Sequence, residues 1–356
     1  MLGKENQCHT SYRSDTQSYL MDKSIGDLFR KHAEDYIRIY KPPLHHIKLI
    51  RAIRVCKTPA LGGKRITCKD CGHTKHIYMS CGHSQCPLCQ NRKRELWQQR
   101  ISEKMLAVPY VHTVFTTPHK LNKLALLNEK VIYNITIRAA WRTIKELCAK
   151  PENVGGTPGM IAVLHTFGSD MKHHVHVHAL ITFGGIDEQG NWQWPKHKKK
   201  LAKYRKICKT YREIFIKMLE DAIAKGEIIS VPDMDDLIQE ISNKRWNVRN
   251  EYPTADTEIL ERYLARYINR IAISKSRLEY LGSQQKLDAE VNITYKDYHR
   301  QVKGQAAPLA IKTLQPLSAI HQFLVHALPP YFQISRYYGL HAAPTFKRFK
   351  DKIPKN

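Results

Sequence analysis

The stretch HHVHVHALIT, residues 173–182, places four histidines within six positions and then continues with apolar residues. Successive side chains of an extended strand point to opposite faces, so His174, His176 and His178 share one face and Val175 and Val177 the other. The apolar face is typical of a strand that packs on a core. The histidine face can bind a divalent cation, activate a nucleophile or line a hydrated sheet surface. The rest of the chain has to separate these roles.

A strand-rich pattern surrounds this stretch. Residues 160–167 (MIAVLHTF) favour a preceding strand, and a turn near Asp170 would join the two as an antiparallel hairpin. That pairing places His165 roughly opposite residues 175–176, which makes His165 a candidate third ligand beside His176 and His178. Asp170 and His174 compete for this role. Further strands are predicted at 110–117, 245–250, 270–281 and 291–298, which together indicate an α+β fold with a mostly antiparallel sheet.

The overall charge indicates a polyanionic partner. The 356 residues contain 58 Lys and Arg against 32 Asp and Glu, a formal net charge of +26. No apolar run of 18 residues is present, so no membrane-spanning segment is predicted. Residues 1–20 are polar, without the apolar centre of a signal peptide, and predict a mobile tail on a cytoplasmic protein.

The cysteines predict a structural zinc site. Five of the nine lie within residues 68–89, and they include two C-x-x-C pairs, Cys68 with Cys71 and Cys86 with Cys89. Two such pairs supply the four thiolates of a closed tetrahedral Zn²⁺ site. Other residues nearby could replace one ligand of the four: Cys81, His73, His76 and His83. A thiol redox site is the alternative, and it fits two facing pairs less well.

Two further segments carry chemically informative side chains. Residues 195–212 (PKHKKKLAKYRKICKTYR) contain nine Lys or Arg and no acid, with an apolar stripe at helical spacing, and predict a basic amphipathic helix. A membrane surface or a nucleic-acid backbone would suit it, and beside a zinc module the phosphate backbone is favoured. Residues 259–270 (ILERYLARYINR) predict a helix on which Tyr263 and Tyr267 are four positions apart and so share one face. Tyrosines at this spacing are more often packing residues, so the pair alone does not define a site.

Together these segments resemble a known family. HVHALITFGG, the Y-x-x-x-Y helix, CPLCQNRKRELW, VPYVHTVFTTPHKLN and LPPYFQISRYYG occur in the order found in rolling-circle insertion-sequence transposases of the IS Ninety-One type. The likeness runs from about Asp27 to Leu340. Their nuclease belongs to the HUH superfamily, and CKTPALGGKRITCKDCGH resembles their N-terminal zinc-binding module. The chain departs from the family in having His174-Val175 before the histidine pair and His165 where a glutamine is common.

The sequence patterns and the resemblance together predict a domain order. Residues 21–108 are expected to form a helical zinc-binding, DNA-binding domain, and residues 109–300 a HUH nuclease domain with a basic helical insertion near 196–228. Residues 301–356 are expected to form a small helical C-terminal region with a basic tail. Arg336, Tyr337 and Tyr338 within it could contact DNA or form a packed aromatic corner.

The resemblance also implies a reaction. His176 and His178, with His165, would bind Mg²⁺ or Mn²⁺, and Tyr263 and Tyr267 would attack phosphates of single-stranded DNA at transposon ends and target. The products would be a 5′-phosphotyrosine and a free 3′-OH, in a protein associated with the bacterial nucleoid. No nucleotide-binding Gly-rich loop is evident in the sequence, so strand displacement would fall to host replication or helicase machinery.

Three alternatives remain at this stage. A HUH replication initiator or relaxase would perform nearly the same cleavage. The run from His174 to Leu180 also fits the histidine-triad nucleotide hydrolases, although these need neither the zinc module nor the charge. The third alternative is a zinc-bearing DNA-binding protein without catalysis, in which the histidines are structural.

Overall fold

The computed structural model describes residues 24–89, 103–256, 272–282, 288–302 and 304–349, together with Leu96, Gln99, Ile101, Leu260 and Ile353. As far as they are described, the residues divide into two compact units. One unit comprises residues 1–92, 169–171 and 271–327, and is called here the zinc unit. The other comprises residues 93–168, 172–270 and 328–356, and is called the sheet unit. Each is described by itself.

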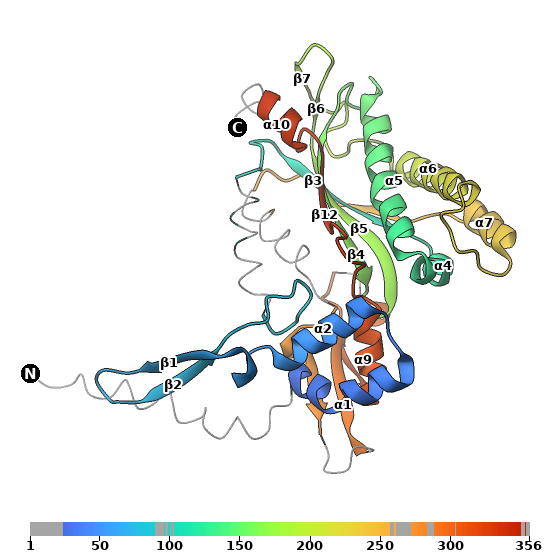
Figure 1. Ribbon diagram of the computed structural model, residues 1–356. Coiled ribbons are helices and arrows are strands. Elements are labelled where there is room, and N and C mark those ends of the chain that lie inside the picture. The colour runs from blue at the N-terminus through green and yellow to red at the C-terminus, as the bar shows by residue number, and fades with distance from the viewer. Residues whose placement is uncertain are drawn as a thin grey trace, which may run out of the picture. The chain divides into compact units, whose positions relative to one another are not determined.

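A five-stranded antiparallel sheet organises the sheet unit (Figure 1). The strands, in spatial order, are β12 (Ser335–Gly339), β4 (Gly159–Phe167), β5 (His173–Thr182), β3 (Tyr110–Thr116) and β8 (Val248–Asn250). The predicted hairpin of β4 and β5 is confirmed, with His165 directly opposite His176. The pairing shifts register between His165 and Phe167, at the end of the hairpin next to its turn. A small hairpin of β6 (Gly185–Ile186) and β7 (Trp192–Gln193) follows β5.

Helices cover one face of this sheet (Figure 1). They are α4 (Asn122–Leu127), α5 (Glu129–Ala149), α6 (Tyr204–Ala224) and α7 (Met234–Asn243). Their apolar sides form one core with the alternate residues of the strands, including Val175 and Val177 of β5. This is the apolar face that the alternation in residues 173–182 predicts. The basic helix begins at Tyr204, so the lysine-rich residues 196–200 precede it.

The opposite face of the sheet carries a smaller core and the histidines. Leu180 of β5 and Ile161 and Val163 of β4 pack there against residues from distant parts of the chain, namely Ile101, Leu106, Val108, Leu260, Leu340 and Ile353. The short helix α10 (Ala343–Phe349) adds Phe346 and Phe349 at its edge. His176 and His178 lie two and four positions before Leu180, and therefore on the same face of β5.

The zinc unit begins with two helices, α1 (Ile25–Tyr40) and α2 (Leu44–Val55). A capping box starts α1: the Ser24 hydroxyl accepts from the Asp27 amide, and the Asp27 carboxylate accepts from the Ser24 amide. The helix ends at Lys41, whose φ of 44° is left-handed, just before Pro42-Pro43. Phe29 of α1 packs edge-on against Phe323 of α9 (Pro316–Leu324).

Two separate sheets belong to the zinc unit. β1 (Gly63–Thr67) and β2 (Thr74–Tyr78) form an isolated antiparallel hairpin, and β9 (Leu278–Leu281), β10 (Glu290–Lys296) and β11 (Leu309–Leu314) form a sheet of order β11-β10-β9. Residues 169–171, the turn of the β4–β5 hairpin, are fixed here by hydrogen bonds from Lys312 to the Asp170 carbonyl and from His326 to the Met171 carbonyl. Four 3₁₀ turns complete the described elements: Pro59–Leu61, His119–Leu121, Lys275–Arg277 and Tyr298–Arg300.

The α+β class is confirmed, and the predicted arrangement needs three corrections. Strands β9 and β10 form their own sheet with β11 and do not join β4 and β5. The N-terminal module is not purely helical, because it includes β1 and β2. The expected helical region 301–356 contributes β11 to one unit and β12 to the other, so the two units do not follow the sequential boundaries 21–108, 109–300 and 301–356.

The helices of the described residues include none with the length and apolar character required to cross a bilayer.

Candidate metal centres

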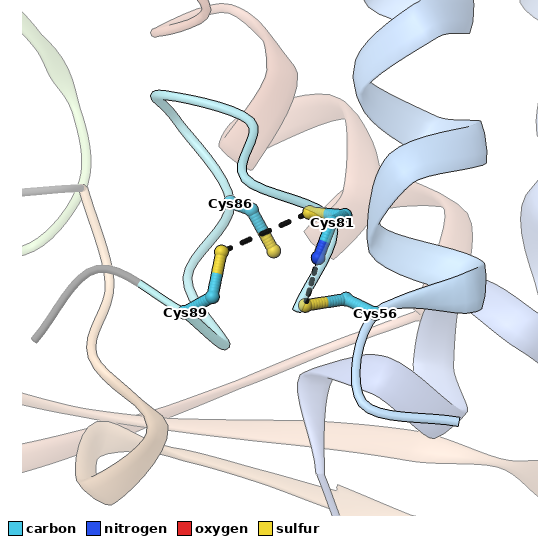
Figure 2. A group of neighbouring side chains, drawn as sticks. All are labelled: Cys56, Cys81, Cys86 and Cys89. Carbon is cyan, nitrogen blue, oxygen red and sulfur yellow. Dashed lines mark hydrogen bonds between the residues drawn. The ribbon is translucent and has the colours of Figure 1, made fainter. Parts of the chain in front are cut away.

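Four cysteines converge in the zinc unit: Cys56, Cys81, Cys86 and Cys89 (Figure 2). Their sulfur atoms all lie within 4.8 Å of one another, and the Sγ atoms of Cys81 and Cys89 are 3.8 Å apart. Sulfurs bound to one Zn²⁺ at about 2.3 Å in a tetrahedron would be about 3.8 Å apart, so the cluster fits a zinc ion. Four thiolates leave no open position, which is the composition of a structural site.

Burial shapes the chemistry of these thiols. It raises the pKa of Cys56 to about 11, and it raises the pKa of Cys86 as well. Thiols with such values stay protonated at neutral pH, so a bound cation has to displace their protons. The backbone amide of Cys81 donates to the Cys56 sulfur at 3.5 Å, an outer hydrogen bond that orients this ligand.

Two of the four predicted zinc ligands lie outside this cluster. Cys86 and Cys89 belong to it, but Cys68 and Cys71 do not, and Cys56 and Cys81 take their places. The reason is the β1–β2 hairpin. Residues 68–73 form its turn. Five residue pairs separate this turn from the base of the hairpin, a length of about 17 Å. Cys56 precedes the base along the chain and Cys81 follows it. Cys81 was a candidate substitute, and Cys56, outside any C-x-x-C pattern, was missed.

Three histidines converge in the sheet unit. The side chains of His165 on β4 and of His176 and His178 on β5 place one nitrogen each within 4.8 Å of the others. Their ring centroids are 4.6 to 5.3 Å apart, and each side chain is at least nine-tenths buried. His174 lies between the exposed His119 and His176, with ring centroids 4.9 and 5.1 Å away, but it offers no nitrogen to the group, and Asp170 lies in the turn assigned to the zinc unit. Of the three alternatives for the third position, His165 is the one in the group.

Hydrogen bonds fix the orientation of two of these imidazoles. The Nδ1 atom of His176 lies 2.8 Å from the carbonyl oxygen of His174, so it donates its proton there. The Nδ1 atom of His178 lies 3.1 Å from Nε2 of His112 on β3. With their Nδ1 atoms engaged in these hydrogen bonds, His176 and His178 would present Nε2 to a cation bound within the group.

A carboxylate extends this chain of hydrogen bonds. Nδ1 of His112 lies 3.5 Å from a carboxylate oxygen of Glu251, the residue after β8, and the Glu251 amide donates to the His112 carbonyl. Burial lowers the pKa of His112, against the opposing effect of Glu251, so the imidazole is neutral at pH 7. A neutral His112 carries its proton on Nδ1, toward Glu251, so its Nε2 accepts a hydrogen bond. The Nδ1 atom of His178 donates that bond, and His178 therefore keeps its proton on Nδ1. Sequence reasoning missed both His112 and Glu251.

A cationic pocket lies beside α6. Its volume is about 360 Å³, and of its described lining residues four are cationic and none is acidic: Arg205, Lys209, Arg212 and Arg245, with Cys208, Asn243 and Trp246. The Arg245 guanidinium lies over the Tyr204 ring, 5.3 Å from its centroid, and Arg212 donates to the Lys244 carbonyl. Clustered cationic side chains and exposed aromatic rings are features of surfaces that bind single-stranded nucleic acid.

The remaining predicted site residues have different outcomes. Tyr263 and Tyr267 lie outside the described residues, and Leu260, three positions before Tyr263, is buried in the histidine-side core of the sheet unit. Tyr338 stacks on Trp141 and the Lys104 ammonium lies over Tyr337, so these tyrosines belong to a packed corner on β12.

Comparison with known proteins identifies the family. A family described as putative transposase matches residues 159–348, which contain the histidine hairpin, and a transposase zinc-binding domain matches residues 28–117. The chain belongs to the insertion-sequence transposases. It is 31% identical over 327 residues to the putative transposase y4qJ of Sinorhizobium fredii, covering 88% of this chain and 79% of that protein.

A second relative agrees with this assignment. Over 312 residues the transposase is 25% identical to the transposase for insertion sequence element IS801 of Pseudomonas savastanoi, with 86% of this chain and 73% of that protein covered. All four cysteines of the cluster lie within the residues that match the zinc-binding domain. Membership of the family makes DNA the partner and strand transfer the general reaction.

Proposed function

We propose that this transposase nicks and rejoins single-stranded DNA at the ends of its element, in the cytoplasm, during rolling-circle transposition. The observation that carries the proposal is the convergence of His165, His176 and His178 from two paired strands. Three neutral imidazoles hold a divalent cation without reducing its charge, and leave coordination positions open for a phosphate. A cation bound there supplies charge stabilisation at the scissile phosphate.

The donor set favours one of the two expected cations. Mg²⁺ prefers oxygen ligands, and all three ligands here are imidazole nitrogens. Mn²⁺ accepts nitrogen more readily, so we propose Mn²⁺ as the better-bound of the pair. Zn²⁺ would also suit imidazoles, and a metal-binding measurement has to include it.

Tyr263 and Tyr267 are the proposed nucleophiles. The phenolic oxygen of one tyrosine attacks the phosphorus, the bond to the 3′-oxygen breaks, and that oxygen leaves with a proton as a free 3′-OH. The burial of Leu260 supports a tyrosine near the histidines, because Leu260 packs in one core with Leu180, two positions beyond His178 on the same face of β5. The Cα atoms of Leu260 and Tyr263 are at most about 11 Å apart, because the two residues are three positions apart in the chain.

The remaining residues bind and orient the strand. The cationic pocket on α6 is the proposed site for its phosphates, since the lining side chains supply four positive charges. His112 and Glu251 are proposed to hold His178 in the ligand tautomer. A rolling-circle initiator or relaxase would use the same groups, so the choice of a transposase rests on the family and not on the site.

A denaturing gel tests the nucleophiles. The purified protein is incubated with Mn²⁺ and end-labelled single strands that carry candidate element ends, alongside Tyr263→Phe, Tyr267→Phe and the double variant. We expect a covalent adduct that disappears in the double variant and persists at a reduced level in one single variant. An adduct that survives in the double variant would exclude these tyrosines. Tight DNA binding without any adduct would indicate a non-catalytic DNA-binding protein. Release of nucleotide from a nucleoside phosphoramidate would favour a histidine-triad nucleotide hydrolase.

A further inference from the structure

The β1–β2 hairpin is the most exposed regular element among the described residues. All five residues of β1 and four of the five in β2 are exposed, and the turn 68–73 extends it further (Figure 1). An isolated two-stranded hairpin is marginally stable in water, so this one needs an anchor at its base. Backbone hydrogen bonds join Gly62 to Met79 and Met79 to Lys57, beside Cys56 and Cys81 of the zinc cluster.

The register separates the hairpin into two different faces. The pairs Arg65 with His76 and Thr67 with Thr74 share one face, which ends at Tyr78. The His76 ring stacks parallel to that of Tyr78, and the hydroxyls of Thr67 and Thr74 are 3.2 Å apart. We call this the polar face, because its side chains are directional hydrogen-bonding groups.

The other face combines charge with apolar groups. The pairs Lys64 with Ile77 and Ile66 with Lys75 lie there, and both isoleucines are about half exposed. Lysine ammonium groups act as point charges without a fixed bonding geometry, which suits a phosphate backbone but does not distinguish bases. We call this the lysine face.

The size and charge of the hairpin fit a duplex groove. Five residues span about 17 Å and two strands are about 4.8 Å apart, whereas the major groove of B-DNA is about 12 Å wide and admits a two-stranded ribbon. The hairpin and its turn carry Lys64, Arg65, Lys69 and Lys75 against the single acid Asp70. The arginine fork and the threonine hydroxyls are groups that contact base edges there.

We propose that the β1–β2 hairpin enters the major groove of double-stranded DNA with its polar face toward the base edges, and that the long lysine side chains of the outward face extend to the phosphates along the groove rims. This inference goes beyond the proposed nuclease, which acts on a single strand through other residues. It assigns to the zinc unit the recognition of a duplex sequence. The zinc ion then serves recognition indirectly, because it holds the two ends of the ribbon together.

Selection from a random pool tests the proposal without knowledge of the element ends. The full-length protein is used to enrich a pool of randomised 20-base-pair DNA duplexes, and the enriched duplex is then the probe for fluorescence anisotropy. The two variants compared are Arg65→Ala and Lys64→Ala. They remove one positive charge each from adjacent exposed positions on opposite faces, so they are matched for charge and for risk to folding.

The two variants should separate sequence recognition from charge. Arg65→Ala should reduce the preference for the enriched duplex over a scrambled duplex by about 10- to 100-fold. Lys64→Ala should weaken the binding of both duplexes equally and lower the slope of log affinity against log salt by about 1. Zinc content and circular dichroism should match the wild type in both. Duplex RNA of the same sequence should compete poorly, because its major groove is too deep and narrow for side chains.

Several results would overturn the proposal. Failure of the wild type to enrich any sequence is one, and equal effects of the two variants on the sequence preference is another. Equal competition by the single strands or by duplex RNA would also contradict it, as would enrichment unaffected by Arg65→Ala together with His76→Ala. Single-strand cleavage by the same preparations is measured in parallel. Cleavage without duplex selectivity rejects the ribbon alone, and duplex selectivity without cleavage rejects the nuclease alone.

Discussion

The two clusters differ in their donors, their number of ligands and the way the chain brings them together. The cysteine cluster has four soft sulfurs from segments that flank one hairpin, whereas the histidine cluster has three nitrogens on two paired strands. Four thiolates complete a coordination shell, and three imidazoles leave it open. The zinc ion is therefore part of the fold, whereas a cation at the histidines would be exchangeable and available for chemistry.

The largest expected effect is on the cysteine side of this comparison. Cys56→Ser should remove zinc from the protein and unfold the zinc unit, because structural zinc contributes on the order of 10–16 kcal/mol to such modules. The matched control is Cys68→Ser, a thiol at the hairpin turn and outside the cluster. Metal analysis and limited proteolysis provide the measurement. Zinc lost from Cys68→Ser and kept by Cys56→Ser would restore the pairing that the C-x-x-C spacing predicts.

A smaller effect is expected at the histidines. His165→Ala should leave the fold and the zinc content intact but reduce single-strand cleavage by about 1,000-fold, the effect of several kcal/mol of lost transition-state stabilisation. His119→Ala, an exposed histidine that packs on His174, serves as the control and should retain cleavage. The two variants are compared in single-turnover cleavage and in Mn²⁺ titration by electron paramagnetic resonance. Full cleavage by His165→Ala would remove this residue from the site.

The outer hydrogen bonds should have a moderate effect. Glu251→Gln and His112→Ala should weaken Mn²⁺ binding by about 10- to 100-fold, with cleavage restored at high Mn²⁺, because these side chains orient a ligand and do not bind the cation themselves. Glu213→Gln, an exposed acid paired with Lys209 on α6, is the control. A purely structural role for Glu251 would instead lower the melting temperature and leave the Mn²⁺ affinity unchanged.

The smallest effect is expected in the cationic pocket. Arg205→Ala combined with Arg245→Ala should reduce single-strand affinity a few-fold and lower the salt slope by about 1.4, since each lost phosphate contact contributes about 0.7. The charge-matched control is Arg142→Ala with Lys217→Ala, from another pocket that α5 and α6 line. Equal loss in both pairs would indicate a response to net charge and not to this pocket.

The sequence predicted the features that depend on local periodicity. The alternation in residues 173–182 located β5, its two faces and, through the turn near Asp170, the pairing of His165 with His176. The apolar stripe in residues 195–212 likewise predicted a basic amphipathic helix, which is α6 and begins at Tyr204.

Features that depend on contacts between distant segments were not predictable. The C-x-x-C spacing does not reveal that a hairpin separates Cys68 and Cys71 from the other pair, and Cys56 has no local signature. His112 and Glu251 become neighbours of His178 only because β3 pairs with both β5 and β8. The long helix α5 was missed as well, although its buried residues recur at helical spacing. The strand β12 was missed because its edge position beside β4 is set by tertiary structure.

We propose that the two clusters hold different metals for different purposes. The most direct measurement treats the full-length protein with a chelator at a concentration that removes exchangeable cations, then follows cleavage of a labelled single strand together with zinc content. We predict that cleavage is lost while one zinc per chain remains, and that Mn²⁺ restores cleavage. Cleavage that persists after chelation, or that disappears only as the zinc is lost, would contradict a separate cation site at His165, His176 and His178.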